Sequence, residues 1–158
     1  MEIIYCCYGG AHTSVTAAAM HLRMLGINKK PCLREIISLP HFDRTPAKSL
    51  GRVLFYGQDH QQNNVYIVSL GPARQATLSA LRLFLQARGM QQKDVLIIDA
   101  LQCVNLSIRV GGFLSRRCGL VALGRHLCAY GIVANFACFK ILLSRVEEDM
   151  KGLTTWRR

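Results

Sequence analysis

Short apolar runs alternate with longer amphipathic segments along most of the chain, and this pattern predicts strands that alternate with helices. The runs at residues 2–7 and 94–99 have the length of a strand, and the second is typical of a strand buried on both faces. Residues 52–56 and 65–70 are also strand-like, and the polar, turn-rich stretch between them predicts a hairpin. Residues 33–39, which a proline follows, predict another strand.

Helical spacing of apolar residues marks the segments between these strands. An apolar stripe in residues 13–25 predicts the first helix, and residues 73–88 predict a second one between a Gly-Pro turn and a glycine stop. Residues 105–118 predict a helix interrupted by a pair of glycines. The remaining segments are a long terminal helix at 131–150, a short stretch at 120–123 that is compatible with a further strand, and a surface loop at 41–51.

Strands that alternate with helices indicate a single three-layer α/β domain over residues 1–150, followed by a basic tail at residues 151–158. We expect a mainly parallel sheet that contains one antiparallel hairpin. The strand at 2–7 should lie inside this sheet and run parallel to the strand at 95–98, because both are apolar on two faces. Ligands of such sheets bind at the carboxyl ends of the strands.

The first strand leads into a glycine turn and then into a helix. This arrangement directs unpaired backbone N–H groups and the positive end of a helix dipole toward one point, which suits a phosphate or another anion. Gly9 and Gly10 let the chain turn sharply and let a ligand approach the backbone. Thr13 and Ser14 add hydroxyl donors at the start of the helix, where they can also cap it. We therefore predict an anion-binding site at this loop.

Cys7 and His12 give the same loop a candidate chemistry. The spacing Cys7-x-x-Gly10-x-x-Thr13-Ser14 resembles the loop of phosphotransferase-system IIB domains, whose cysteine receives a phosphoryl group. It is similar, more loosely, to the loop of low-molecular-weight tyrosine phosphatases, although Thr13 stands at the position of their arginine. The chemistry requires Cys7 as a thiolate, stabilised by N–H groups and a helix N-terminus, with His12 as acid or base. The alternative is that Cys7 packs at a strand end and that His12 bonds a nearby carbonyl.

A second candidate wall of the site lies in residues 105–118. On a helix, Arg109, Gly112 and Arg116 fall on one face, and a glycine between two arginines leaves room for a flat or charged ligand. The alternative is that the glycine pair marks close helix packing while the arginines are solvated. The candidate ligand-binding residues of this segment are Asn105, Arg109, Gly112, Ser115 and Arg116.

Two carboxylates near strand ends are further candidates. Asp59, in the hairpin connection, could bind a metal or act as a base, but turn chemistry explains Asp59 and Asn64 without a function. Asp99 ends a strand where α/β proteins often hold a magnesium-binding carboxylate, and it is equally placed to cap the next segment. No motif has the ligand spacing of a zinc site, and none specifies a cofactor.

The formal net charge of +11 favours an anionic partner, whether a phosphorylated small molecule, a nucleic acid or a membrane surface, and does not rank these. No apolar run is long enough to span a bilayer, so we expect no membrane partner. Seven scattered cysteines without a CxxC pair indicate reduced thiols, and the N-terminus has no export signal. We therefore expect a cytoplasmic protein.

Three separated blocks occur in order: Tyr5–Ser14, then Phe55-x-Gly57-x-Asp59 followed by Val65-Tyr66, then Asn105 with Arg109–Arg116. Together they resemble the signature blocks of an uncharacterised conserved family of spore-forming bacteria, domain of unknown function family 3189. The resemblance extends to about Glu148 and implies one cytoplasmic domain without assigning an activity. His60 stands where the second block should have an acidic residue, which weakens a metal or acid–base role for that block.

The residues leave two classes of function open. In the first, the domain binds a phosphorylated or otherwise anionic small molecule between the Gly9–Ser14 loop and the Arg109–Arg116 segment. An enzyme of this class would catalyse phosphoryl transfer or phosphoester hydrolysis. In the second, the protein is a non-catalytic binding or regulatory module whose basic face meets nucleic acid or a protein partner. The oligomeric state is open in both.

Overall fold

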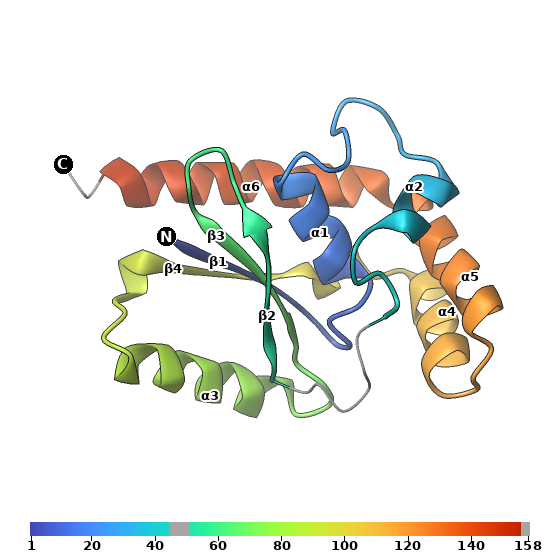
Figure 1. Ribbon diagram of the computed structural model, residues 1–158, viewed down its shortest axis with the longest axis horizontal. Coiled ribbons are helices and arrows are strands. Elements are labelled where there is room, and N and C mark those ends of the chain that lie inside the picture. The colour runs from blue at the N-terminus through green and yellow to red at the C-terminus, as the bar shows by residue number, and fades with distance from the viewer. Residues whose placement is uncertain (45–50, 156–158) are drawn as a thin grey trace.

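A four-stranded mixed sheet forms the centre of the fold in the computed structural model, which describes residues 1–44 and 51–155 (Figure 1). The strand order is β2-β3-β1-β4. β1 runs parallel to both β3 and β4, whereas β2 and β3 form the antiparallel hairpin that the sequence predicts. The strands are β1 (Glu2–Cys7), β2 (Val53–Gln58), β3 (Asn64–Ser69) and β4 (Val95–Asp99).

β1 is an inner strand of this sheet. Ile3 lies opposite Val65 of β3 and Leu96 of β4, so the predicted parallel pairing of the first strand with residues 95–98 is confirmed. The prediction that β4 is buried on both faces is wrong. Among the described strands β4 pairs with β1 alone, and as an edge strand most of its residues are only half-buried. The apolar run therefore indicates the length of the strand but not its position in the sheet.

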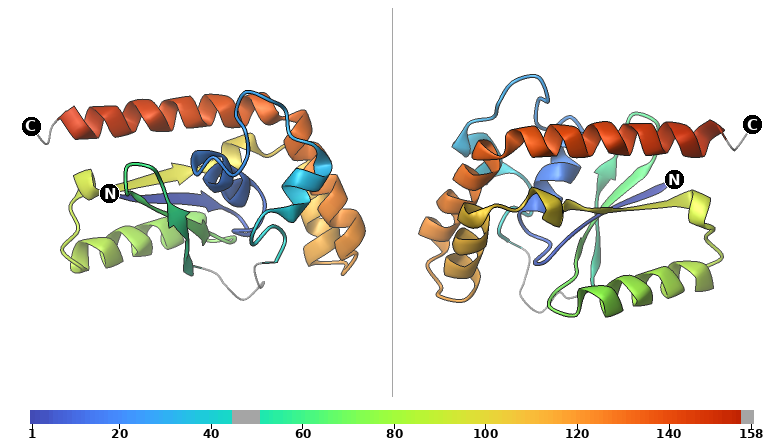
Figure 2. Two further views of the ribbon diagram at one scale, coloured as in Figure 1. Left: turned by 45° about the horizontal axis from the view of Figure 1, so that its top comes forward. Right: turned by 180° about the vertical axis from the view of Figure 1, so that it is seen from behind.

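Helices cover both faces of the sheet and one of its ends (Figures 1 and 2). α1 and α6 lie along one face and α3 along the other, while α4 and α5 form a helical hairpin at the end to which β1 and β4 lead. The helices are α1 (Thr13–His21), α2 (Leu33–Ser38), α3 (Arg74–Ala87), α4 (Leu106–Arg116), α5 (Val121–Ala134) and α6 (Phe136–Thr155), with 3₁₀ turns at Gln92–Asp94 and Ala100–Cys103.

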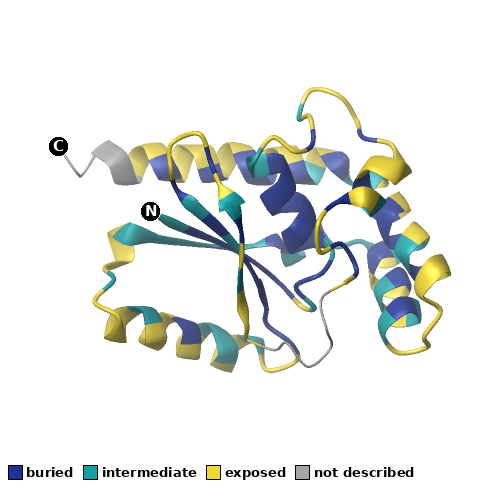
Figure 3. Ribbon diagram, in the orientation of Figure 1, coloured by how far each residue is buried: buried dark blue, intermediate teal, exposed yellow. Residues whose placement is uncertain are grey.

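Each face of the sheet has its own core. Ile3 and Tyr5 of β1 belong to the core under α1 and α6, whereas Ile4 and Cys6 belong to the core that contains Leu81 of α3. This is the alternation expected of a strand covered on both faces. Figure 3 shows α1 buried along its length, because it packs against the sheet on one side and α6 on another. α1 is therefore buried on more sides than the single apolar stripe in its sequence predicts.

Residues 33–39 contain the short helix α2 instead of the predicted strand. The local reason is a cap at its start, where the Cys32 N–H donates to the Glu35 carboxylate over 2.7 Å. This backbone hydrogen bond lowers the pKa of Glu35. Ile36 is the one buried residue of α2, and Leu33 is exposed. The segment thus contributes a single side chain to the core. A capped helical turn can bury one side chain as well as a strand can.

The end of the chain also differs from the prediction. Residues 120–123 lead into α5 and form its first turn, so a strand there is wrong, and the single helix predicted at 131–150 is two helices that break at Asn135. The Asn135 amide donates to the Cys103 carbonyl over 3.0 Å, which holds the break against the turn after β4. Within the described residues no single helix is long and apolar enough to cross a membrane. α5 and α6 reach that length and hydropathy only together, and they are bent by 65°.

α4 is continuous through Gly111 and Gly112, although the sequence predicts an interruption there. Gly111 faces α5, because a Cβ at this position would lie 2.7 Å from the Gly124 carbonyl oxygen. A Cβ at Gly124 would in turn lie 2.5 Å from the Gly111 carbonyl oxygen. Gly112 faces another side, where a Cβ would meet the His12 ring at an ordinary 3.6 Å. The two adjacent glycines therefore have different roles.

Gly111→Ala should destabilise the fold by about 2 kcal/mol, since the added methyl group overpacks the contact between α4 and α5. Gly112→Ala is the matched control, because it brings the same gain in helix propensity without the clash. It should stabilise the fold by up to about 1 kcal/mol. Urea unfolding of both variants measures the difference. Equal free energies of unfolding for the two variants would contradict the packing described for α4 on α5.

Candidate functional site

A cavity of about 1240 Å³ opens beyond the carboxyl ends of the parallel strands. Its lining includes Cys7 at the end of β1, Ser69 at the end of β3 and Leu101 just after β4. The β1–α1 loop (residues 8–12) forms one wall and α4 forms another. The fold therefore brings the two predicted site segments together around one space, while the binding of an anion there stays a prediction.

Cys7 joins the loop to the sheet and lines the cavity. The Gly10 N–H donates to Cys7 Sγ over 3.1 Å, and Ser14 Oγ lies 3.1 Å from the same sulfur atom. Ser14 is in the first turn of α1, so the loop and the helix each place a hydrogen-bonding group on Sγ. Because Cys7 is only 4% exposed and borders the cavity, a ligand would reach the sulfur through that cavity.

The neighbouring thiol at Cys6 has a different environment. Its Sγ contacts the Ile4 carbonyl oxygen at 3.9 Å, and its side chain packs in the core with Leu81 of α3. Burial raises the pKa of Cys6 to about 12, so this thiol stays neutral at physiological pH. Successive strand residues point to opposite faces, and Cys6 is therefore an internal control for the chemistry of Cys7.

The two loop glycines have different roles. Gly10 has a φ of +59°, and a Cβ there would lie 3.0 Å from the backbone nitrogen of Ser69, so the turn and its packing on β3 require glycine. Gly9 lines the cavity, and a Cβ there would lie 3.7 Å from Arg116 Nη2. Of the two glycines predicted to admit a ligand, Gly9 borders the cavity and Gly10 shapes the loop.

Neither Thr13 nor Ser14 caps α1, contrary to the expectation from their residue types. His12 occupies the N-cap position, and its side chain makes no capping hydrogen bond. Thr13 lines the cavity instead, and Ser14 contacts Cys7. The first turn of α1 also contains no acidic residue. The positive end of the helix dipole is therefore not neutralised by a carboxylate of its own first turn.

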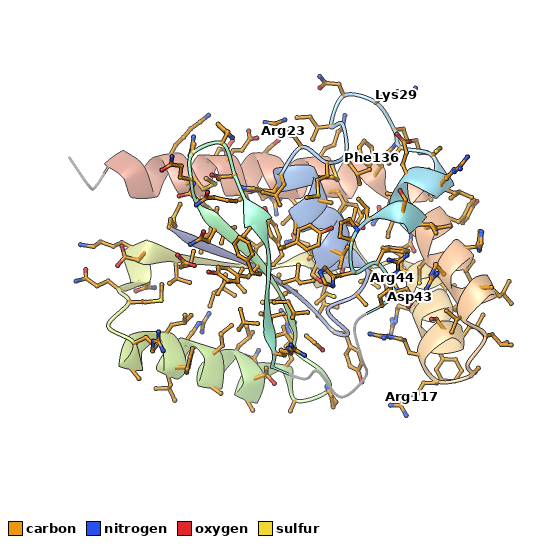
Figure 4. All side chains as sticks on the ribbon, in the orientation of Figure 1. Arg23, Lys29, Asp43, Arg44, Arg117 and Phe136 are labelled. Carbon is orange, nitrogen blue, oxygen red and sulfur yellow. The ribbon has the colours of Figure 1, made fainter. Side chains whose placement is uncertain are left out.

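The buried carboxylate of Asp43, which is labelled in Figure 4, has partners on three segments around the site. It accepts a hydrogen bond from His12 Nε2–H over 2.9 Å and another from Ser115 Oγ–H over 2.6 Å. Nε of Arg125, in α5, lies 3.6 Å from the same carboxylate. The backbone of Asp43 has a φ of +54°, a conformation that is costly outside glycine. These contacts tie the β1–α1 loop, α4 and α5 to one side chain.

Sequence reasoning missed Asp43. It belongs to the segment at 41–51, which the lapse of the apolar pattern predicts to be a surface loop; residues 45–50 of that segment lie outside the described residues. The partners of Asp43 are far along the chain, 31 positions away at His12 and 72 at Ser115. The one local signal is Phe42, an aromatic residue inside a polar stretch, which is fully buried.

Burial raises the pKa of Asp43, but the hydrogen bonds from His12 and Ser115 outweigh this effect and hold the pKa below its ordinary value. Asp43 is therefore a carboxylate at neutral pH and accepts a hydrogen bond from His12 Nε2–H. The other ring nitrogen, Nδ1, lies on the side of Gly112, whose Cβ position is 3.7 Å away. His12 and Gly112 both line the cavity, so Nδ1 is the ring nitrogen next to this part of the lining.

α4 contributes three arginines to the lining of the cavity. Arg109 and Arg116 border it together with Gly112, as the helical spacing predicts. Arg116 Nη2 donates to the Gly9 carbonyl over 3.3 Å, so this guanidinium reaches from α4 to the β1–α1 loop. Arg117, the C-cap of α4, also lines the cavity and was not among the residues predicted for the site.

Two of the residues predicted to bind a ligand have structural partners instead. Asn105 Oδ1 accepts from the Ile108 N–H and caps α4, while its amide donates to the Gly131 carbonyl of α5. Ser115 is buried and donates to Asp43. Both lie outside the cavity lining. Asn105 therefore fixes the helical hairpin, and Ser115 acts on the site through Asp43.

The carboxylates of Asp59 and Asp99 also lie outside the cavity lining. Asp59 Oδ1 accepts from the Asn63 N–H over 2.8 Å, which is the turn chemistry that the sequence predicts as one alternative. Asp99 accepts from the Leu101 N–H over 3.0 Å, as a cap does, and forms an ion pair with Arg74. Among the residues that the structure describes, no group of three or more His, Cys, Asp or Glu side chains could hold a metal ion.

Asp43→Asn should destabilise the protein by about 1–3 kcal/mol, because one of the hydrogen bonds to the buried group is then left unmade. The folded pKa of Asp43 lies below its unfolded value of about 3.9. The advantage of the wild type is therefore fully present above that pH, and it decreases as the pH falls through the folded pKa.

Urea unfolding of the wild type and the Asp43→Asn variant between neutral and acid pH measures this advantage. Asp149→Asn, which changes an exposed carboxylate on α6, is the control and should have little effect at any pH. A difference between wild type and Asp43→Asn that stays constant down to the most acid pH would contradict a charged Asp43 in the folded protein.

Comparison with known proteins assigns a family. Searches of curated proteins and of solved structures each gave no match to the chain. The profile of a family described as Protein of unknown function (DUF3189) matches residues 2–148, a span that contains the cavity and both of its walls. The chain therefore belongs to this family, as its three motif blocks predict.

Proposed function

We propose that this protein binds a phosphorylated small molecule in the cavity and transfers its phosphoryl group to Cys7. The observation that carries the proposal is the environment of Cys7 Sγ, which borders the cavity with the Gly10 N–H and the Ser14 hydroxyl each 3.1 Å away. N–H donors and a helix N-terminus beside the sulfur are the surroundings in which reactive cysteines occur, and Ser14 belongs to the first turn of α1. A thiolate is the nucleophilic form of cysteine.

The charges around the cavity suit a phosphate group. Its lining in the described chain contains Arg109, Arg116 and Arg117 and no Asp or Glu. The N-terminus of α1 adds backbone N–H groups of the kind that bind phosphate. Thr13 stands where the resembling phosphatase loop has an arginine, and Arg116 supplies a guanidinium to the same loop from α4, as its hydrogen bond to Gly9 supports.

The proposed reaction has two steps. In the first, the Cys7 thiolate attacks phosphorus, the S–P bond forms and the ester P–O bond breaks. The leaving oxygen takes the proton that His12 carries on Nδ1 in addition to the one on Nε2, which leaves a neutral ring. In the second, water attacks phosphorus and gives a proton to His12, while the S–P bond breaks and returns the thiolate with release of inorganic phosphate. Asp43 keeps His12 oriented through Nε2, so that Nδ1 transfers the proton in both steps.

The alternative of a non-catalytic module for nucleic acid or a protein partner depends on the net charge of +11. Charge alone does not select among anionic partners. Nucleic acid is bound chiefly through salt-sensitive contacts to its phosphates. A nearly buried thiol and a histidine held by a carboxylate add nothing to such contacts, whereas they are what phosphoryl transfer needs. We therefore expect ligand binding in the cavity to depend only weakly on salt.

Inorganic phosphate should raise the unfolding temperature of the wild type, since a ligand selective for the folded state stabilises it. Arg116→Ala should remove most of this rise, because the guanidinium that joins the two walls of the cavity is lost. Arg145→Ala removes an exposed arginine of α6 and is the matched control, which should keep the rise. Differential scanning fluorimetry at constant ionic strength measures it. Equal rises in both variants would exclude Arg116 from anion binding.

Cys7 should react with iodoacetamide faster than the exposed Cys118 at neutral pH, because hydrogen bonds to its sulfur favour the reactive thiolate. Bound phosphate should protect Cys7 and leave Cys118 unaffected. Cys6, which burial keeps neutral, should stay unlabelled. Mass spectrometry of the labelled peptides gives the three rates. Cys7→Ser should in addition abolish phosphate release from phosphate esters while keeping the thermal response to phosphate.

Slow labelling of Cys7 that phosphate does not affect would end the proposal of covalent chemistry. Anion binding without covalent chemistry would then be tested by the effect of phosphate on the unfolding temperature of Arg116→Ala. The labelling experiment thus tests Cys7 as a nucleophile, and the fluorimetry tests the anion site independently of it.

A further inference from the structure

The turn between α4 and α5 exposes an apolar surface, the hairpin tip, which consists of Phe113 and residues 117–123. Every residue from 117 to 123 is exposed. Leu120 is 51%, Val121 42% and Leu123 59% exposed, and Phe113, one turn earlier on α4, is 58% exposed. Adjacent large apolar side chains on a surface mark a place of interaction more often than isolated ones do.

Positive charge accompanies these apolar side chains. Arg117 belongs to the hairpin tip, and Arg116 precedes it. Residues 100–146, which include both helices of the hairpin, contain six Lys and Arg residues and no Asp or Glu. The Asp43 carboxylate that contacts the hairpin is buried, so it does not belong to this surface. A surface that combines cations with apolar groups is complementary to one that combines negative charge with an apolar layer.

The shape of the hairpin tip favours a lipid surface over a protein. Figures 1 and 2 show the α4–α5 hairpin at one end of the molecule, with its turn directed away from the sheet, and Figure 4 shows Arg117 at that end. A projecting turn of leucines beside arginines can insert its apolar side chains at a lipid interface while the guanidiniums meet headgroup phosphates. A protein partner would need a hollow that is both apolar and acidic to receive the same turn.

We propose that the hairpin tip docks on an anionic membrane surface. The expectation of no membrane partner followed from the lack of a spanning segment, and docking at the interface needs none. Phe113 and Arg117 also line the cavity, so docking would place the cavity beside the lipid headgroups. Leu120 and Leu123 are outside the cavity lining, so substitutions at these two leucines test the docking separately from the chemistry at Cys7.

Co-sedimentation of the full chain with lipid vesicles tests the docking. The protein should bind vesicles of equal parts phosphatidylglycerol and phosphatidylcholine but not phosphatidylcholine alone, and the bound fraction should fall with added salt. The double variant Leu120→Asp, Leu123→Asp should lose this binding, because carboxylates at the tip are repelled by the anionic surface. Arg117→Ala should bind roughly fivefold more weakly, as expected for the loss of one basic residue near such a surface.

Leu83→Asp is the matched control, since Leu83 is 65% exposed and lies on α3 rather than on the hairpin. It should bind the anionic vesicles as the wild type does, and all variants should keep their unfolding temperature. Failure of the wild type to bind these vesicles would overturn the proposal, as would equal binding by the double variant. Binding of the wild type to immobilised poly-L-glutamate but not to the vesicles, with loss of that binding in the double variant, would assign the surface to an acidic protein partner and also overturn it.

Discussion

The buried carboxylate of Asp43 is the interaction on which the candidate site depends. A charge removed from water costs several kcal/mol unless hydrogen bonds and opposite charges satisfy it. Here His12 comes from the β1–α1 loop, Ser115 from α4 and Arg125 from α5. A shift of any one of these elements would leave part of the charge without a partner. One side chain therefore fixes the relative position of both walls of the cavity and the orientation of the histidine between them.

Close packing of α4 on α5 decides which side chains α4 presents to the cavity. Gly111 has to face α5, since a Cβ would lie 2.7 Å from the Gly124 carbonyl oxygen. The helical repeat then determines the rest, because with Gly111 against α5 the face that carries Arg109 and Arg116 borders the cavity. The close packing at Gly111 therefore determines that positive charge borders the cavity. Of the two alternatives that the sequence presents for the glycine pair, helix packing explains Gly111, whereas Gly112 borders the cavity, where ligand binding stays a prediction.

The predictable parts of the molecule are those with a local cause. The unit from Glu2 to His21 and the β2–β3 hairpin have their own periodicity and turn residues, and the structure has both. Residues 33–39 were mispredicted because a cap at Glu35 outweighs an apolar run that is too short to decide between strand and helix. The edge position of β4 and the role of Asp43 depend on partners far along the chain. No local pattern of apolar and polar residues contains that information.

A loop that takes its guanidinium from another element has a physical consequence for any anion bound near Cys7. If the arginine belonged to the loop, the loop backbone alone would fix its position. Arg116 instead meets the Gly9 carbonyl from α4, whose position depends on Asp43 and on the packing against α5. The affinity of the proposed anion site would then depend on the position of the whole helical hairpin. The same helix ends at the exposed apolar tip. Binding at the tip that shifts α4 would therefore change the position of the Arg116 guanidinium, and by reciprocity an anion bound there would change the affinity of the tip.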